Sequence, residues 1–217
     1  MPLLEVDDLS MSFADKKLYE NASFTLEKGE HMGVVGQNGV GKSTLIKIIT
    51  EQELPLTGTV KWQKKTHIGY LDQYADIPDG MTLIDFLHTA YADLYAMNDR
   101  MTAMYTEYAE TMNDKLLERA GRIQEELDAR NFYDVETEIE RVISGLGLDD
   151  IGRDHAVAKM SGGQRSKIIL AKLLLENPDV ILLDEPTNYL DVAHIAWLED
   201  YLNNFDGAAL IISHDYD

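Results

Sequence analysis

The sequence contains no cysteine, which excludes disulfides and thiolate metal sites. No run of eighteen or more apolar residues is present, and no basic-then-apolar segment opens the chain. We therefore expect neither a membrane span nor a secretory signal, and a cytoplasmic location. The six histidines form no close-spaced pair that resembles a metal-ligand motif, which argues against a structural metal.

Positive charge is also scarce. Lysine and arginine together number 19 against 39 aspartates and glutamates, so the formal net charge is −20. This balance lacks the basic footprint of an ordinary nucleic-acid binder. The 217 residues, 45% of them apolar and 27% charged, predict one globular domain with one sizeable core.

The first third of the chain has the pattern of short strands around one helix. Residues 3–6 and 22–26 predict a small antiparallel sheet around a polar turn at 14–17. The apolar stretch 31–36 predicts a strand that runs through a glycine-rich turn into a helix at 42–50. Further strands are expected at 59–62 and 67–71.

The middle of the chain differs, because good helix formers dominate from Thr82 to about Gly145 and no proline occurs there. Apolar residues recur at three- and four-residue steps, which predicts two long helices meeting near residue 113 and a further helix at 139–146. From Ser161 the α/β pattern returns. It predicts a helix through Glu176, a strand at 180–183, a helix at 192–202 and a strand at 209–213.

The strongest chemical signal is a Walker A pattern, G-x-x-x-x-G-K-[ST], between the strand and the helix. Its backbone N–H groups are expected to surround phosphates at the N-terminus of the helix. Lys42 would reach the β- and γ-phosphates, and Ser43 would bind Mg²⁺. The predicted ATP-binding loop consists of Gly36, Gln37, Asn38, Gly39, Val40, Gly41, Lys42, Ser43 and Thr44.

A second signal is the apolar strand at 180–183 that ends in Asp184 and Glu185. Taken alone, such an acidic pair is more often the start of a solvated loop. After a Walker A motif it predicts a Walker B element, in which Asp184 orients the Mg²⁺ shell and Glu185 orients the attacking water.

Ser161-Gly162-Gly163-Gln164 makes the resemblance specific, because it matches the signature of the ATP-binding cassette (ABC) family. The resemblance implies a P-loop NTPase of RecA-like α/β fold, with an antiparallel β subdomain and a helical subdomain. Alone, Phe13 would be read as a core aromatic, and Gln73 or His214 would mean nothing. Together, in the family's order, they imply a ring stacked on adenine (Phe13), a Q-loop residue with catalytic and metal-binding roles (Gln73), a D-loop (188–191) and a catalytic switch histidine (His214).

In the ABC family two cassettes close head to tail, so that the signature of one meets the ATP held by the other. The resemblance therefore implies a second cassette as partner, with Ser161, Gly162, Gly163 and Gln164 acting on ATP in trans. Two positions depart from the usual pattern. Met160 stands where leucine is common, and Tyr189 stands where the D-loop often has histidine.

Within the family, three features resemble the translation-associated ABC-F class. The stretch between Gln73 and Ser161 is long enough to hold an inserted helical arm, and the segments 186–191 and 159–167 resemble the class's usual forms. This implies the ribosome as a partner, with Arg100, Lys115, Arg119 and Arg122 as candidate contacts on the arm. The alternative is the ATPase subunit of a membrane transporter, whose partner would be a transmembrane permease.

The expected organisation is a single ABC ATPase domain over residues 1–217. Residues 1–78 would form the β subdomain and the first part of the core, 79–158 the helical subdomain with its arm, and 159–217 the signature helix, Walker B, D-loop and switch histidine. The strand and helix alternation stops four residues after Ser213, so we expect that the domain is truncated at its C-terminal end. ATP and Mg²⁺ are the expected cofactors, with weak turnover by the isolated chain.

Overall fold

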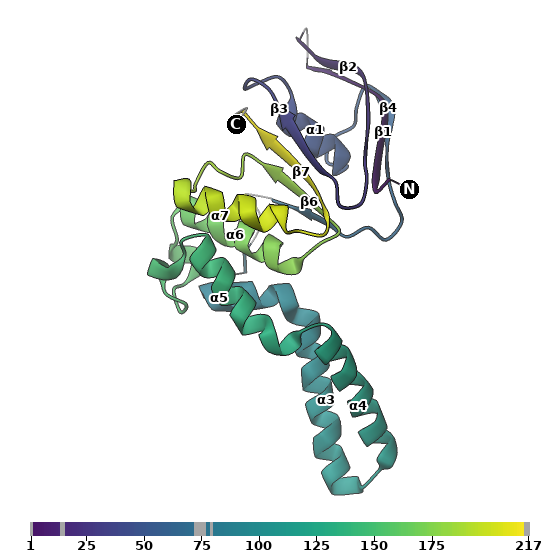
Figure 1. The fold of residues 1–217 in the computed structure, drawn as a ribbon, viewed down its shortest axis with the longest axis vertical. Helices are drawn as coiled ribbons and strands as arrows, with labels where there is room; N and C mark the ends of the chain where they lie inside the picture. The colour runs from purple at the N-terminus through teal and green to yellow at the C-terminus, as the bar shows by residue number, and fades with distance from the viewer. Residues whose placement is uncertain (1, 14–15, 72–76, 79, 215–217) are drawn as a thin grey trace.

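The structure is a computed structural model that describes residues 2–13, 16–71, 77–78 and 80–214. Strands and helices alternate at both ends of the chain, and helices alone occupy the middle (Figure 1). The strands are β1 (Leu4–Phe13), β2 (Lys16–Leu26), β3 (His31–Val35), β4 (Thr57–Trp62), β5 (Ile68–Tyr70), β6 (Val180–Asp184) and β7 (Ala208–Ser213). The α-helices are α1 (Lys42–Ile49), α2 (Leu83–His88), α3 (Ala92–Thr111), α4 (Asp114–Ala129), α5 (Val135–Gly145), α6 (Gly162–Glu176) and α7 (Val192–Asn203).

The described strands form two sheets. One is antiparallel with the order β2-β1-β4, and the other is parallel with the order β3-β7-β6-β5. The antiparallel sheet, α1 and the parallel sheet enclose a shared apolar core, in which Leu26, Ile46, Ile49 and Leu210 have no solvent exposure. The predicted α/β class, with an antiparallel β subdomain and a helical subdomain, is confirmed.

The register of the parallel sheet places the carboxyl ends of β3, β7 and β6 at one edge. Val35 of β3 pairs with Ser213 of β7, and Ile212 of β7 pairs with Asp184 of β6. Because parallel strands end at the same edge, the segments that follow β3, β6 and β7 emerge side by side. Ligands of open α/β sheets bind at this carboxyl edge.

The predicted pair of long helices is present as the antiparallel hairpin of α3 and α4, which projects away from the sheets (Figure 1). We call α3 and α4 together the arm. Its inner face buries Leu94, Met97 and Met101 of α3 against Ala120 and Leu127 of α4. The hairpin turns at Met112 and Asn113, close to the predicted meeting point.

The first of these helices is shorter than the sequence pattern indicates. The helical stretch after Thr82 is interrupted by a 3-10 turn at Thr89–Tyr91, which separates α2 from α3. The Thr89 hydroxyl donates a hydrogen bond to the carbonyl oxygen of Phe86. Such a side-chain bond competes with the regular helical pattern and favours a tighter turn. The arm therefore begins at Ala92.

The predicted polar turn at 14–17 is also shorter than expected, because β2 begins at Lys16 rather than at residue 22. β2 is an edge strand of the antiparallel sheet, and much of it is exposed. An edge strand needs little apolar alternation, so its first half has no clear sequence signal. Among the described residues, no helix is both long and apolar enough to cross a membrane.

Candidate functional site

The loop after β3 leads directly into α1, as the Walker A pattern requires. Gly39 and Gly41 have φ angles of 78° and 105°, in the left-handed region of backbone conformation that residues with a side chain rarely adopt. A Cβ atom on Gly41 would also lie 2.9 Å from Leu18 Cδ1. Glycine is therefore required at Gly41 by both backbone conformation and space.

Lys42 folds its side chain back over this loop. Its ammonium donates hydrogen bonds to the carbonyl oxygens of Gly36, at 2.5 Å, and Gln37, at 3.3 Å. The same nitrogen lies 3.7 Å from Glu185 Oε1, and the two side chains are only 8% and 17% exposed. The cation of the loop and the carboxylate after β6 are therefore neighbours in space.

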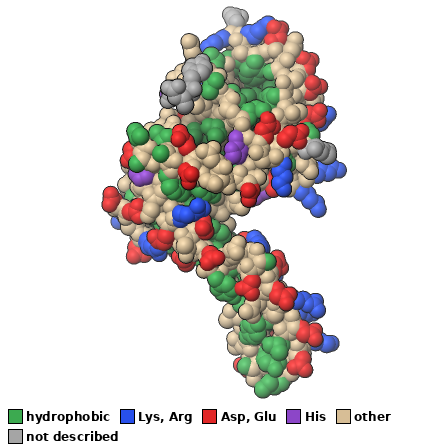
Figure 2. Space-filling view, in the orientation of Figure 1, with side chains coloured by type: hydrophobic (Ala, Val, Ile, Leu, Met, Phe, Trp, Pro, Cys, Tyr) green, Lys and Arg blue, Asp and Glu red, His purple; other side chains and the backbone are tan. Residues whose placement is uncertain are grey.

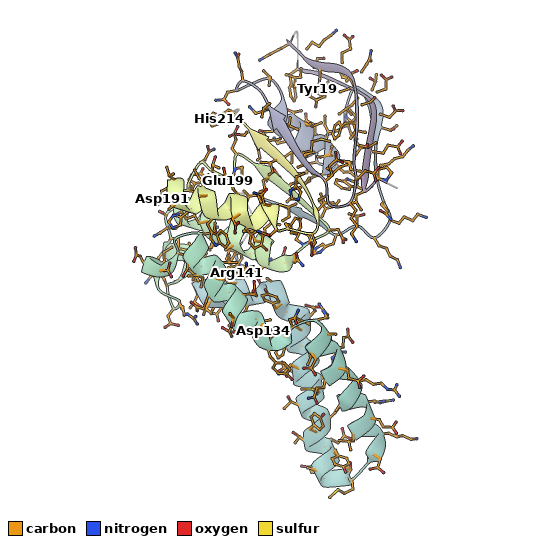
Figure 3. The ribbon with its side chains drawn as sticks, in the orientation of Figure 1. Tyr19, Asp134, Arg141, Asp191, Glu199 and His214 are labelled. Carbon is orange, nitrogen blue, oxygen red and sulfur yellow. The ribbon has the colours of Figure 1, made fainter. Side chains whose placement is uncertain are left out.

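Glu185 also contacts the residue after β7. Its Oε2 lies 2.6 Å from His214 Nδ1, and because a carboxylate only accepts, the imidazole N–H is the donor. Figure 3 labels His214 where β7 ends. The backbone N–H of Glu185 donates to Ile212 O at 3.0 Å, and its φ of 49° is unusual for a residue other than glycine. The backbone thus holds the carboxylate between the side chains of Lys42 and His214.

Asp184 ends β6 beside Glu185. Its Oδ1 atom is buried and has no hydrogen-bond partner among the described residues. A buried carboxylate oxygen without a partner is costly, and a divalent cation or its water shell would satisfy it. The chemistry of this position, together with the Ser43 hydroxyl at the start of α1, fits Mg²⁺.

An open cavity of about 340 Å³ joins the loop to the antiparallel sheet. Phe13 lines it with a side chain that is 48% exposed, which suits stacking against a planar base. The complete lining consists of Phe13, Leu18, Asn38, Gly39, Gly41, Lys42, Ser43, Thr44 and Glu185. Most of the predicted ATP-binding residues are therefore assembled around one cavity.

Two residues near this cavity were missed by sequence reasoning. Leu18 lines the cavity and packs over Gly41, and Lys16 Nζ donates to Gly39 O at 2.6 Å. Both lie at the start of β2, across the hairpin from Phe13, which pairs with Lys16. Pairing the segments on either side of the predicted turn would have placed them opposite the aromatic residue.

The signature residues lie elsewhere in the fold, and none of the four lines this cavity. Ser161 caps α6 through a reciprocal capping box. Its hydroxyl accepts from the N–H of Gln164 at 3.3 Å, and Gln164 Oε1 accepts from the N–H of Ser161 at 2.9 Å. A cap of this kind fixes the first turn, whose remaining N–H groups point out of the helix end. Gly162 and Gly163 are the first two residues of α6 and supply such groups.

The predicted D-loop connects the two regions. Asn188 N donates to Glu185 O at 3.3 Å, and a Cβ atom on Gly163 would lie 3.5 Å from Tyr189 Cδ1. Asp191 caps α7, and the backbone N–H of His194, which donates to its carboxylate, lowers the pKa of Asp191. Tyr189 thus belongs to the segment that follows Glu185 and lies beside Gly163 at the start of α6.

Gly36, Gln37 and Val40 of the predicted loop do not line the cavity, although Gly36 and Gln37 accept hydrogen bonds from Lys42. Val40 is 40% exposed. Gln73 lies outside the residues that the structure describes.

Comparison with known proteins shows that the chain is similar to a family model and to several curated proteins. A model of the ABC transporter family matches residues 19–188. The ABC transporter ATP-binding protein YfmM of Bacillus subtilis is 47% identical over 99% of this chain, and the energy-dependent translational throttle protein EttA of Escherichia coli is 35% identical over 92%. The tylosin resistance ATP-binding protein TlrC of Streptomyces fradiae is 31% identical over 98%. The chain spans only 42%, 36% and 39% of these relatives, respectively.

Solved structures are similar across the whole chain. The ATP-binding subunit of an ABC transporter aligns with a TM-score of 0.67 at 21% identity, covering 98% of this chain and 79% of that one. The archaeal ribosome recycling factor aABCE1, in complex with the ribosomal stalk protein aP1, aligns with a TM-score of 0.67 at 26% identity. That match covers 99% of this chain and 34% of the other.

Proposed function

The chain belongs to the ABC transporter family of ATP-binding cassettes, and we propose that it serves an ABC-F protein in which ATP-driven closure of two cassettes controls engagement of the ribosome. The family membership implies ATP binding and hydrolysis. The proposal adds the roles of individual residues, the second cassette and the ribosome.

ATP would bind in the cavity between Phe13 and the start of α1. The Phe13 ring would stack on adenine, and Lys42 would leave the carbonyl oxygens of Gly36 and Gln37 for the β- and γ-phosphates. The N–H groups of the loop and the N-terminus of α1 add a positive electrostatic field at the same place.

Mg²⁺ would be held by Ser43 and Asp184, with Gln73 as a further ligand from the Q-loop. Once bound, the ion neutralises phosphate charge. Glu185 would hold and orient the attacking water, and His214, now 2.6 Å from that carboxylate, would turn to the γ-phosphate. Glu185, His214 and Gln73 are thus the proposed catalytic residues.

A single cassette would hold half of each of two ATP sites. Ser161 and the N–H groups of Gly162, Gly163 and Gln164 would contact ATP bound to a second cassette. Because that contribution comes from a partner, we expect weak turnover from the isolated chain. The proposed division of residues 1–217 is the one given by the sequence, with boundaries at 78 and 158.

The observation that carries the ABC-F assignment is the arm. Its hairpin exposes Met112 (71%) and Leu117 (41%) near the tip, and Lys115, Arg119 and Arg122 follow at helical spacing along α4. A projecting element with apolar and cationic side chains suits contact with a large partner. EttA is named an energy-dependent translational throttle protein and aABCE1 a ribosome recycling factor, which supports a role in translation.

A transporter ATPase is the second candidate, because the ATP-binding subunit of an ABC transporter has the same fold. In that case the exposed helical surface would contact a transmembrane permease. The arm would then be a coupling element rather than a ribosome-binding element.

Co-sedimentation distinguishes the two candidates. The full-length protein carrying Glu185→Gln, with the matching change in any second cassette, is incubated with ribosomes and with membranes in excess ATP. The substitution should block hydrolysis and accumulate the closed state. ATP-dependent pelleting with ribosomes supports the ABC-F proposal, whereas ATP-dependent pelleting with membranes alone would replace it with the transporter function.

A further inference from the structure

A hollow of about 350 Å³ lies at the amino ends of the parallel strands, on the edge opposite the ATP cavity. It is lined by Lys28 and by Lys64 and Lys65 of the β4–β5 turn. We call it the lysine hollow. Within the described part of the chain, these three exposed lysines make no ion pair, whereas Lys17, Lys42 and Lys172 all do.

We propose that the lysine hollow binds the phosphate backbone of structured RNA, as a second contact beside the arm. This proposal rests on the proposed ribosomal function. It assigns a partner chemistry to a surface that has no part in the ATP site.

The lysine hollow differs from the rest of the chain in its charge balance. The whole chain has 19 cationic against 39 acidic residues, but the hollow has three lysines against two carboxylates, Asp179 and Asp206. One of those carboxylates is already engaged, because Asp179 Oδ2 accepts from the N–H of His67 at 2.8 Å. Figure 2 shows Lys and Arg side chains gathered where the β subdomain overhangs the arm. The local excess of cations is therefore the reverse of the overall balance.

The backbone around the hollow is fixed at several points. Gln63 N donates to Leu3 O at 2.9 Å, Thr66 N donates back to Gln63 O at 3.2 Å, and Asp179 N donates to His67 O at 2.9 Å. A preordered turn presents its side chains with less loss of entropy on binding. Backbone hydrogen bonds on both sides therefore hold the turn that carries Lys64 and Lys65.

The backbone conformation of Lys65 also indicates that its side chain has a role. Its φ is 68°, in the left-handed region where glycine or asparagine costs less. A lysine at that position is less favourable than glycine, from backbone sterics alone. The cost is explained if the side-chain charge is needed at the mouth of the hollow.

The distribution of charge indicates the kind of polyanion. An acidic protein repels nucleic acid in general, so flexible RNA gains little by approaching it. A rigid RNA can touch separate cationic spots, the lysine hollow and the side chains of Lys115, Arg119 and Arg122 on α4. Lysine ammonium groups bind phosphate as point charges and read no base sequence, so the contact would be independent of sequence.

The position of the hollow makes it independent of nucleotide chemistry. It adjoins the starts of β6 and β7, whereas Asp184 and His214 lie at their ends, and a five-residue strand separates the two edges by about 16 Å. Loss of the hollow's charge should leave ATP affinity unchanged.

The test uses the full-length protein on the Glu185→Gln background and measures its affinity for ribosomes in ATP at several salt concentrations. Lys64→Gln/Lys65→Gln is compared with Lys47→Gln/Lys61→Gln, which removes the same charge from exposed lysines outside the hollow's lining. Each lost phosphate contact should reduce the slope of log affinity against log salt by about 0.9, so the hollow variant should lose about 1.8 and the control nothing. Adding Lys28→Gln should increase the loss.

An unchanged slope in the hollow variant, or an equal loss in the control, overturns the proposal. Weaker ribosome binding with an unchanged slope also overturns it, because the loss then involves no phosphate contact. If the Glu185→Gln protein does not bind ribosomes at all, the proposed function fails. The same variants are therefore also titrated with a 20-base-pair RNA duplex at low salt, where a smaller slope in the hollow variant alone supports RNA binding independently and equal slopes refute it.

Discussion

Lys42 Nζ lies 3.7 Å from Glu185 Oε1 while Glu185 Oε2 lies 2.6 Å from His214 Nδ1, so one carboxylate engages both side chains proposed to hold the γ-phosphate. In this arrangement Glu185 occupies the electrostatic position that phosphate would take. Incoming nucleotide must displace it from Lys42, and the displacement opposes binding.

The first prediction concerns ADP. Glu185→Gln should bind ADP about three- to tenfold more tightly, because the neutral amide competes less for Lys42; this corresponds to about 0.7–1.4 kcal/mol. Isothermal titration calorimetry with ADP is the measurement, since ADP cannot be hydrolysed and the result does not depend on trapping. Glu107→Gln on the arm is the matched control, and equal ADP affinity in all three proteins would contradict the idea.

The second prediction concerns Phe13. Phe13→Ala should weaken ATP binding by about 1–3 kcal/mol, because it removes a stacking face, whereas Phe13→Tyr should bind as the wild type does. An aromatic ring reads no base edge, so GTP should be affected as much as ATP. Titration with both nucleotides checks this, and a loss confined to ATP would exclude simple stacking.

The third prediction concerns Asp184, whose Oδ1 is buried without a partner among the described residues. Asp184→Asn replaces the carboxylate, whose buried Oδ1 lacks a partner, with a neutral amide, so the free energy of unfolding without ligand should rise by about 1 kcal/mol. The same change should abolish the increase in ATP affinity on adding Mg²⁺. Thermal melts without nucleotide, and titrations with Mg²⁺ and with EDTA, test the two halves separately. A lower melting temperature would show that Asp184 has a structural partner.

The fourth prediction concerns pH and the base of the arm. Glu136 of α5 accepts hydrogen bonds from Tyr95 at 2.9 Å and His88 at 2.7 Å. Partial burial raises the pKa of Glu136, but the hydrogen bonds from Tyr95 and His88 and the charges of His88 and Arg153 outweigh it, so this pKa lies below its ordinary value of 4.5. A lowered carboxyl pKa stabilises the fold above about pH 4.5 and loses that stabilisation as pH falls through the folded-state pKa.

Glu136→Gln should therefore flatten the decline in stability below pH 4.5. At neutral pH it should cost at most about 1 kcal/mol, because the carboxylate is half exposed. Denaturant unfolding between pH 3 and 7 is the measurement. If the free energy of unfolding falls equally in both proteins below pH 4.5, the contacts of Glu136 with Tyr95 and His88 do not contribute to acid stability.

Much of the fold follows from local sequence pattern. The glycine-rich turn after 31–36, the acidic pair after 180–183 and the helical spacing between 82 and 145 each predicted an element that the structure contains. These signals are strong because buried strands and amphipathic helices require apolar residues at a fixed period.

The missed features depend on pairing between strands rather than on the pattern within one segment. β2 extends to Lys16 because it pairs with β1, although the sequence of residues 16–21 has no strand pattern of its own. Leu18 reaches the ATP cavity only because that pairing exists. The contacts of Glu185 with Lys42 and His214 likewise arise from strand order, β3-β7-β6, which motif spacing does not contain. The proposed roles of Gln73, Ser161 and the other site residues remain predictions.

The arm is joined to the rest of the chain at one end only, and α3 has 20 residues, so it is a lever about 30 Å long. A rotation of about 10° at its base would move its tip by about 5 Å, by simple proportion to that length. Small displacements at the base of the arm, next to α2 and α5, would thus become movements as large as one helical turn at Met112.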